Sequence, residues 1–377
     1  MTGRVLFWVQ HLLGTGHVQR TLAIAAALAA RGARPTVVLG GLSLPIRTAP
    51  GVEVVRLPGL RAGPGGFTDL RDAQGLPVGE ALWRQRRERL LAIAEERRPD
   101  VVVTEMFPFG RRAFTAEVTA LLDACTAARK VVSVRDILVS KADPARLTAM
   151  RDLVLSRYDR VLVHGDPALL PFAATFPLAD TLGERLIHTG LVVVATEPGP
   201  LAAKPAETGV VLVSCGGGAV GRGLLRASLA ARPLSALYAA PWLVITGAGA
   251  DEADLLELAG RAPPGVAIER HRADFPALLA SCRLSVSQAG YNTVAEALQA
   301  GARMVLVPFA AVGEDEQTIR ARRLVELGRA AMVEERLLSP LALARAVDRA
   351  LAGPDPGPSR FALDGAARAA ASILELV

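Results

Sequence analysis

Short apolar runs alternate with amphipathic helical stretches along almost the whole of this chain of 377 residues. Runs such as 101–104 and 131–134 are rich in valine and have the length of buried strands. The stretches between the runs, such as 78–97 and 144–157, repeat apolar residues at helical spacing. This alternation predicts parallel sheets covered by helices on both faces.

The expected strands are 5–9, 36–39, 52–55, 101–104, 131–134 and 160–163, then 210–214, 242–246, 266–269, 284–287, 304–307 and 331–333. The clearest expected helices are 18–31, 78–97, 112–127, 144–157 and 359–376.

The alternation occurs twice, which predicts an α/β chain of two doubly wound Rossmann-like domains that face each other across a cleft. The first domain is expected over 1–195 and the second over 210–352. Residues 196–209 between them are rich in proline, alanine and glycine and are interpreted as a linker. The last segment, 353–377, is expected to hold a helix that returns to the first domain.

Composition narrows the functional class. The chain is 51% hydrophobic and 21% charged, which is enough for two buried cores and argues against disorder. The net charge is +6, but the basic residues are scattered and only 4% of residues are aromatic, so nucleic acid is not an expected partner.

The cysteines and the hydropathy of the chain indicate its compartment. Cys125, Cys215 and Cys282 show no metal-ligand spacing, and they favour a reducing compartment. No apolar run approaches the roughly 18 residues that span a bilayer. The sequence predicts a cytoplasmic protein, with contact to the inner face of the cell membrane left open.

The segment from Ser287 to Glu296 is the strongest functional signal. It contains a small polar turn, Gln288 to Gly290, between an expected strand and an expected helix. Free backbone N–H groups and the helix dipole at such a junction favour an anion such as a diphosphate, with Asn292 and Thr293 beside it. Glu296 lies further along the helix, where its carboxylate can accept hydrogen bonds from a ribose diol.

A second glycine turn follows the strand that ends at Ser214. Gly216, Gly218 and Gly221 match the spacing of a dinucleotide fingerprint, but the next strand ends without the acidic residue that the fingerprint needs. A nicotinamide or flavin cofactor is therefore not expected. The turn is interpreted as facing a phosphate, and the alternative is a tight turn that needs positive φ. The residues expected to contact the phosphate are Ser214, Gly216, Gly217 and Gly218.

A third glycine turn, Gly14-Thr15-Gly16-His17, lies at the first strand-to-helix junction. A helix N-terminus lowers the pKa of an imidazole, so His17 is a candidate general base, and the alternative is a capping or packing histidine. Glu105 follows the expected strand 101–104, and Arg135 and Asp136 follow 131–134. Glu105 and Asp136 are candidate reserve bases and Arg135 a candidate substrate contact, although a helix cap and a simple ion pair remain alternatives.

Glu316 and Gln317 follow the strand 304–307 and the dipeptide Pro308-Phe309. A carboxylate beside an amide offers acceptors and a donor for sugar hydroxyls. The alternative is acidity in the first turn of a helix, which complements the helix dipole.

These motifs together resemble the nucleotide-sugar glycosyltransferases of the GT-B type. The resemblance is greatest to family 28, which includes the bacterial N-acetylglucosaminyltransferase of lipid-linked cell-wall synthesis. The matching residues are 14–17, 214–219, 287–296, 308–309 and 316–317. The chain also resembles a group of predicted bacterial glycosyltransferases through residues 10–17 and 104–112. The resemblance covers most of 210–333 and is patchy in the first half.

The resemblance implies a role for each matching residue. Glu296 would bind the ribose, Gly290, Asn292 and Thr293 the diphosphate, and Glu316 and Gln317 the donor sugar. His271 would border the base, and His17 would be the base that acts on the acceptor. The sequence departs from the family at Gly217, where a polar residue is usual.

The expected activity is therefore inverting, metal-independent transfer of a hexose or N-acetylhexosamine from a nucleoside-diphosphate sugar. UDP is the expected nucleotide, and the acceptor is a hydroxyl of a saccharide, a lipid or a small molecule. No cofactor is expected. Two alternatives stay open: a nucleotide-sugar 2-epimerase of the same architecture, and a non-catalytic subunit that binds nucleotide sugars.

Overall fold

A computed structural model gives the structure of most of the chain and divides it into two compact units. The described residues are 3–12, 14–43, 46–138, 143–194, 209–216, 221–247, 249–272, 274–310 and 315–377. The predicted linker, 196–209, lies outside them except for its last residue.

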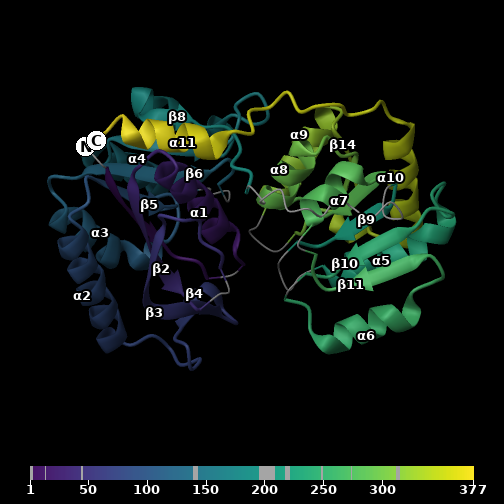
Figure 1. The fold of residues 1–377 in the computed structure, drawn as a ribbon, viewed down its shortest axis with the longest axis horizontal. Helices are drawn as coiled ribbons and strands as arrows, with labels where there is room; N and C mark the ends of the chain where they lie inside the picture. The colour runs from purple at the N-terminus through teal and green to yellow at the C-terminus, as the bar shows by residue number, and fades with distance from the viewer. Residues whose placement is uncertain are drawn as a thin grey trace. The chain divides into compact units, whose positions relative to one another are not determined.

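The first unit comprises Met1–Val193 together with Phe361–Val377. Its eight-stranded sheet has the order β4-β3-β2-β1-β5-β6-β7-β8 (Figure 1). All neighbouring strands are parallel except β3 and β4, which form an antiparallel pair. The strands are β1 (Arg4–Val9), β2 (Arg34–Gly41), β3 (Glu53–Gly63), β4 (Gly66–Arg71), β5 (Val101–Glu105), β6 (Arg129–Arg135), β7 (Arg160–His164) and β8 (Leu186–His188).

The helices of the first unit follow the parallel strands. They are α1 (Gly16–Ala29), α2 (Glu80–Arg97), α3 (Thr115–Ala124), α4 (Pro144–Arg157) and α11 (Gly365–Leu374), with 3₁₀ turns η1 (Arg112–Phe114), η2 (Phe172–Ala174) and η3 (Ala179–Arg185). The chain returns from the second unit to supply α11, which packs on α1. The return comes at Phe361, later than the expected start of the segment at 353. The chain ends meet there, because a Cβ atom on Gly3 would lie 3.0 Å from the Val377 side chain.

The second unit comprises Val194–Arg360. Its six-stranded sheet has the order β11-β10-β9-β12-β13-β14, and every neighbouring pair is parallel. The strands are β9 (Val211–Ser214), β10 (Trp242–Ile245), β11 (Val266–Glu269), β12 (Leu284–Ser287), β13 (Met304–Leu306) and β14 (Ala330–Met332). The helices are α5 (Arg222–Ala231), α6 (Glu252–Arg261), α7 (Phe275–Ser281), α8 (Tyr291–Gln299), α9 (Glu316–Glu326) and α10 (Pro340–Ala352), with 3₁₀ turns η5 (Arg232–Leu234) and η6 (Glu335–Leu337).

Each sheet reverses its strand order at one point. The reversal lies between β1 and β5 in the first unit and between β9 and β12 in the second. Loops after adjacent strands diverge to opposite faces at such a point, and the crevice between them is where open α/β sheets bind ligands. The predicted fold class of two doubly wound α/β domains is confirmed, and the predicted cleft between them stays a prediction.

A buried ion pair ties helices α2 and α3 to the first sheet. Arg86 is fully buried and donates to both carboxylate oxygens of Glu117 at 2.9 Å, and to the carbonyl of Gly40. Trp8 Nε1 donates to the same carboxylate at 2.9 Å. A buried ion pair is tolerated when further hydrogen bonds offset the loss of its hydration. The bonds from Trp8 to Glu117 and from Arg86 to Gly40 have this effect.

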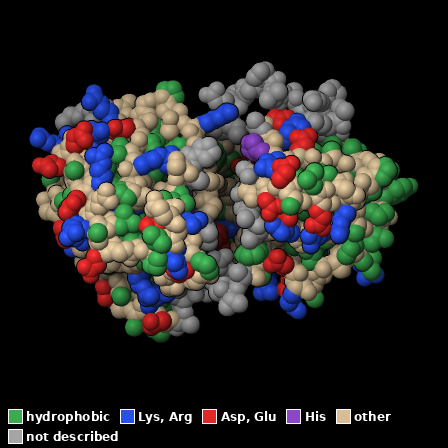
Figure 2. All heavy atoms as spheres, turned by 90° about the horizontal axis from the view of Figure 1, so that it is seen from below, with side chains coloured by type: hydrophobic (Ala, Val, Ile, Leu, Met, Phe, Trp, Pro, Cys, Tyr) green, Lys and Arg blue, Asp and Glu red, His purple; other side chains and the backbone are tan. Residues whose placement is uncertain are grey.

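On the outside, basic and acidic side chains are interspersed over each unit on the face drawn in Figure 2.

Two elements differ from the sequence prediction. The pair β3–β4 extends well beyond the expected strand 52–55 and turns at Gly66, which has φ +74°. The expected helix 112–127 is divided into η1 and α3, because Arg111 before it takes positive φ and the chain enters as a tight turn. Helix α4 has the predicted bounds, with Asp143 as a side-chain cap and Pro144 at the first position.

Candidate functional site

The loop after β1 leads directly into α1 at the reversal point of the first sheet. Gly14 has φ +64°, a conformation open to glycine, and Thr15 takes the N-cap position without a side-chain hydrogen bond. Gly16 begins the helix, and His17 lies in its first turn. The loop therefore places the imidazole at the carboxyl edge of the sheet.

His17 contacts Glu105, which ends the neighbouring strand β5. His17 Nδ1 lies 2.6 Å from Glu105 Oε1, and the side chains are 18% and 1% exposed. Arg20, one turn further along α1, donates from Nη2 to the same oxygen at 2.5 Å. His17 and Arg20 of α1 thus form one buried cluster with Glu105, which lies far from them in the sequence.

The charge states of this cluster follow from its surroundings. Burial lowers the pKa of His17 to about 4, against the opposing effect of Glu105. Burial alone would raise the pKa of Glu105, but His17 and Arg20 outweigh it and lower that pKa to about 2. At neutral pH the carboxylate is therefore ionised and accepts the Nδ1 hydrogen of a neutral imidazole, which leaves the Nε2 lone pair able to take a proton.

This geometry bears on the role predicted for Glu105. A carboxylate with a pKa near 2 is a weak base, and Glu105 is held by His17 and Arg20. Its contact with His17 fits an orienting role, and its predicted role as a reserve base stays a prediction. Arg20 was missed, although its spacing of three residues from His17 on a predicted helix places the two on one face.

The other reserve base lies on the next strand. Asp136 is buried just after β6, and its Oδ1 accepts a hydrogen bond from the backbone N–H of Ile137. Arg135 ends β6 and is half-buried. Strands β5 and β6 are neighbours, so Arg135 and Asp136 lie at the same sheet edge as Glu105. Their predicted roles stay predictions.

In the second unit, the two predicted phosphate turns lie next to each other. Ser214 and Ser287 end the adjacent strands β9 and β12 and are partners in register. Gly216 has φ +71°, and a Cβ atom there would lie 3.6 Å from Thr293 Oγ1. The reversal point of this sheet thus brings the two turns together. Gly217 and Gly218 lie outside the described residues.

Helix α8 begins at this point without a side-chain cap. Gly290 is the N-cap, and the first intrahelical bond runs from Val294 N–H to the Gly290 carbonyl. The first N–H groups of an α-helix have no acceptor within the helix, so those of Asn292 and Thr293 can meet a ligand. Three side-chain oxygens around the turn are buried without a hydrogen-bond partner among the described residues: Ser214 Oγ, Ser287 Oγ and Asn292 Oδ1. Polar atoms of this kind are expected where a ligand completes the hydrogen bonding.

Glu296 lies on α8 below this turn. Its side chain is largely buried, and no hydrogen bond or ion pair to its carboxylate is seen within the described parts of the chain. Burial raises the pKa of Glu296 to about 7. An acceptor with an unmet demand for hydrogen-bond donors is suited to a diol.

Gln317 and Glu316 hold the loops rather than lying open. Gln317 Oε1 accepts the N–H of Ala289 at 3.0 Å and that of Phe309 at 3.1 Å, and so connects the loops after β12 and β13. Glu316 Oε1 lies 2.8 Å from Arg320 Nη2, and Arg320 Nη1 donates to the Ala289 carbonyl. Both residues therefore brace the turn that contains Gln288, which is itself buried.

His271 lies apart from the paired turns by topology. It is exposed and follows β11, the edge strand, with β10 between β11 and β9. Its predicted place beside the base stays a prediction.

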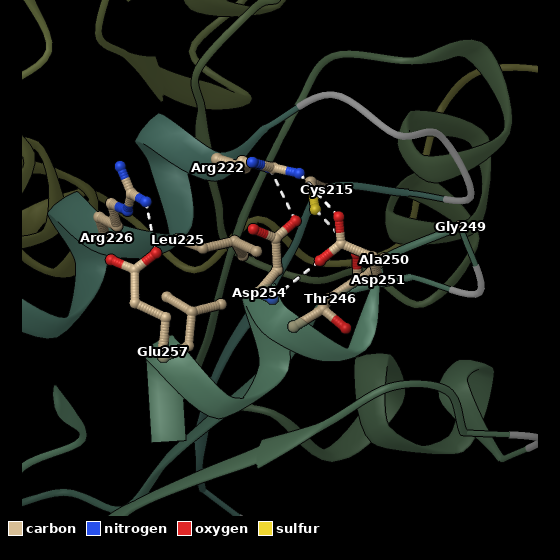
Figure 3. A pocket seen from close by; sticks show the side chains of 11 residues that line it. Cys215, Arg222, Leu225, Arg226, Thr246, Gly249, Ala250, Asp251, Asp254 and Glu257 are labelled. Carbon is tan, nitrogen blue, oxygen red and sulfur yellow. Dashed lines mark hydrogen bonds and ion pairs between the residues drawn. The ribbon is translucent and has the colours of Figure 1, made fainter. Parts of the chain in front are cut away.

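A small pocket of about 110 Å³ lies between α5 and α6, beside the turn after β9 (Figure 3). Cys215, Leu225 and Leu258 contribute apolar atoms to its lining. Its charged side chains are paired, with Arg222 2.7 Å from Asp254 and Arg226 2.5 Å from Glu257. Asp251 caps α6 by accepting the N–H of Asp254, as expected for a helix start.

The described residues offer neither a metal-ligand cluster nor a membrane-spanning helix. Within the described ranges, no group of three or more His, Cys, Asp or Glu residues is arranged to hold a metal ion. No described helix combines the length and hydropathy needed to cross a bilayer.

Comparison with known proteins adds to this geometry. Residues 211–369 match the glycosyltransferase family 28 C-terminal domain, and residues 15–176 match a glycosyl transferase 4-like domain. The two matches cover the regions that contain the paired turns and the His17–Glu105 contact.

The C-terminal part of the chain resembles glycosyltransferase family 28, and the chain has the GT-B fold. The predicted resemblance is thereby confirmed, and the homologues and both matching models indicate the glycosyltransferase class. A relative from Exiguobacterium is 33% identical over 147 residues, which are 38% of this chain and 39% of its own length. It is described as UDP-N-acetylglucosamine–N-acetylmuramyl-(pentapeptide) pyrophosphoryl-undecaprenol N-acetylglucosamine transferase. The match between this chain and that relative thus spans well under half of the relative's length.

Solved structures show the fold over the whole chain. The crystal structure of Acinetobacter baumannii MurG has a TM-score of 0.59 and 15% identity, with 99% of each chain covered. The calicheamicin glycosyltransferase has a TM-score of 0.61 and 21% identity, with 100% of this chain and 95% of that chain covered. At 21% and 15% identity, these structural similarities support the fold of the chain alone.

Proposed function

We propose that the protein transfers a hexose or N-acetylhexosamine from a nucleoside-diphosphate sugar, with UDP as the nucleotide, to an acceptor hydroxyl, with inversion and without a metal ion. The observation that carries the proposal is the contact of largely buried His17 with Glu105, because burial keeps the imidazole neutral and the carboxylate orients it. A binding subunit would have no use for such a base.

The donor is proposed to bind in the second unit. The N–H groups that begin α8, with Thr293 and Asn292, face the diphosphate, and Ser214 and Gly216 contribute from the adjacent turn. Glu296 accepts hydrogen bonds from the ribose hydroxyls. Gln317 and Glu316 keep the loops in place, so their contact with the donor sugar is less direct than the sequence predicts.

The reaction is proposed as a single displacement. The acceptor oxygen attacks the anomeric carbon while its proton passes to His17 Nε2. The bond from the anomeric carbon to the phosphate oxygen breaks, and its electron pair leaves with the nucleoside diphosphate. The α8 amides stabilise the charge that develops there, because they are already oriented before the reaction. Glu105 stabilises the imidazolium that forms.

A panel of UDP-, GDP- and dTDP-sugars tests the proposal. Thermal shifts and isothermal titration identify the nucleotide, and transfer to candidate hydroxyl acceptors identifies the reaction. Release of an inverted glycoside supports the proposal. Epimerised sugar formed from donor alone would instead indicate a 2-epimerase, and binding without turnover across all acceptors would indicate a binding subunit. A cytoplasmic location is part of the same proposal.

A further inference from the structure

Arg20 joins the contact between His17 and Glu105 from the buried side. Its side chain is 2% exposed, against 18% for that of His17 one turn earlier on α1. Arg20 Nη2 donates to Glu105 Oε1 at 2.5 Å, the same oxygen that lies 2.6 Å from His17 Nδ1. The Nη2 and Nδ1 atoms are 3.1 Å apart. One carboxylate oxygen therefore serves two donors, and one of these donors carries a permanent positive charge.

The charge balance of these three side chains depends on Arg20. With the guanidinium in place, the ionised Glu105 is already compensated, and a proton added to His17 would create a net positive charge. Without the guanidinium, a neutral His17 would leave the buried carboxylate uncompensated, and a proton on the imidazole would cancel its charge. Because burial disfavours net charge, Arg20 favours the neutral imidazole and its removal favours the imidazolium.

The contact with Glu105 has two opposite effects on a base. It fixes the imidazole with Nδ1 as the donor, which leaves the lone pair on Nε2. It also stabilises the imidazolium, and an imidazole that is protonated before the reaction cannot take a proton. Arg20 on the same oxygen weakens the second effect, while the distance of 2.6 Å from Nδ1 to Oε1 preserves the first.

Other charged groups around the contact act in the same direction or are neutral. Burial lowers the pKa of His17, Glu105 opposes this, and Arg111 and Arg20 lower the pKa further. Arg111 lies before η1 and is itself influenced by Arg135 of β6. Arg20 is thus the member of this group that the hydrogen bonds place directly on Glu105 Oε1.

His164, which ends β7, is a second histidine close to the same groups. It is fully buried, with Nε2 2.7 Å from Ser133 Oγ and Nδ1 2.9 Å from Thr189 Oγ1. Burial lowers the pKa of His164 to about 3, with Arg20 adding to the decrease and Glu105 opposing it. His164 is therefore neutral and does not supply the counter-charge of Glu105.

We propose that Arg20 is a positioning residue that takes up the charge of Glu105, so that the carboxylate orients His17 while the imidazole stays neutral. That this imidazole is the base rests on the proposed function, whereas the effect of Arg20 on its charge does not. A structural role alone would mean that Arg20 joins α1 to β5 and leaves the titration of His17 unchanged.

The charge of His17 is measured without any substrate. NMR of protein that contains isotope-labelled histidine reports the tautomer and charge of each imidazole as the pH is varied, and the signal absent from His17→Gln identifies His17. In Arg20→Met, the pH at which His17 gains its proton is expected to rise by about 1–3 units, the usual effect of one neighbouring charge. Arg20→Lys keeps the positive charge and is expected to stay close to wild type.

Arg86→Met is the matched control. Arg86 is 0% exposed and also pairs with a buried glutamate of the first unit, Glu117, but its other contacts are Gly40 and Gln10. The control should lose stability in thermal unfolding and keep the wild-type titration of His17. If Arg20→Met does not fold, Arg20→Met is combined with Glu105→Gln, which leaves neither buried charge alone. Compared with Glu105→Gln, this double variant should protonate His17 at higher pH.

A rise in Arg20→Met that Arg20→Lys reverses supports the inference. An unchanged titration in folded Arg20→Met, no difference between the double variant and Glu105→Gln, or an equal rise in Arg86→Met would overturn it. The proposed function is tested separately by kinetics, since the acid limb of kcat should move to higher pH together with the titration of His17. A titration that moves while the acid limb does not would remove His17 as the base and leave the charge effect of Arg20 in place.

Discussion

The pKa of His17 shows how burial sets the charge of a side chain. An exposed histidine is partly charged near neutral pH, whereas His17 has a pKa near 4 and stays neutral. Glu105 keeps Nδ1 as the hydrogen-bond donor, and so Nε2 is the basic nitrogen. In the proposed reaction, the same contact makes the imidazolium less costly to form, because an ionised carboxylate lies 2.6 Å away.

Replacement of His17 by alanine is expected to lower turnover by about 10²–10⁴-fold, since proton transfer in the transition state is lost. UDP affinity should change little, because His17 belongs to the first unit. Initial-rate kinetics and titration calorimetry measure the two effects. Turnover that survives the substitution would assign the base to another group.

Replacement of Glu105 by glutamine tests the orienting role. The amide keeps the shape but removes the negative charge that raises the pKa of His17. The wild-type rate should fall as pH drops toward about 4, where His17 gains a proton. In the variant, that acid limb should move to still lower pH while the plateau rate decreases. An acid limb at the same pH would argue against the contact.

Glu296 is expected to couple nucleotide binding to proton release. Its pKa of about 7 leaves the free protein roughly half protonated at pH 7. Ribose hydroxyls donate best to the ionised carboxylate, so binding favours loss of that proton, and UDP affinity should rise from pH 6 to pH 8. Calorimetry in two buffers of different ionisation enthalpy would measure about half a proton released at pH 7. Glu296→Gln, which cannot ionise, should bind UDP more weakly and release none.

The sequence predicted the candidate site residues more reliably than the contacts between them. His17 and Glu105 were both identified as candidates from their places after strands. Their contact joins residues 88 apart in the chain, and only the order of strands in the sheet brings them together. Gln317 was predicted to meet a sugar, but a glutamine that accepts two backbone N–H groups cannot be told from an open one without the loop conformation.

At the scale of elements, the turns after β9 and β12 of the second unit lie next to each other. β9 and β12 are adjacent only because the sheet reverses its order there. A glycine after one strand thereby comes near a threonine in the helix that follows the other. The two turns therefore lie next to each other, as the proposed diphosphate site requires.

Gly216→Val should weaken UDP binding about tenfold or more, because a branched residue is strained at φ +71° and the turn must shift. Gly209→Val is the matched control. Gly209 also has positive φ, at +80°, but it precedes β9 at the other end of the strand. Both variants should lose similar stability, measured by thermal unfolding, and only Gly216→Val should lose affinity. Equal affinity losses would remove the turn from the site.

The bounds of a helix or strand could be predicted where residues at its ends, such as a cap, determine them. Asp143 and Pro144 mark the start of α4, and the observed bounds agree. The hairpin β3–β4 was missed because residues beyond 55 include prolines and glycines that are typical of loops, and tertiary pairing with β2 overrides that preference.

The whole molecule is an insertion of one unit into another. The chain leaves the first unit at Val193 and returns at Phe361. Helix α11 then buries Ala369, Ala370 and Ile373 in the apolar cluster that contains Val18 and Leu22 of α1. The first unit therefore depends on the last residues of the chain.

Deletion of residues 361–377 should destabilise the first unit by several kcal/mol, since it exposes the face of α1 that α11 covers. The second unit should keep its own melting transition and its UDP affinity. Differential scanning calorimetry with and without UDP separates the two transitions. A single unaltered transition would contradict the assignment of α11 to the first unit. Ile373→Ala offers a milder test, with an expected loss of about 2–5 kcal/mol.

The late position of α11 has a consequence for synthesis on the ribosome. The face of α1 that α11 covers emerges early, and α11 is made only after the second unit. At about 5–20 residues per second, roughly 10 to 30 s pass while the inserted unit is made. The inserted unit can complete its fold in that interval. In a nascent chain of this protein, the first unit therefore cannot complete its fold until the second unit has been translated.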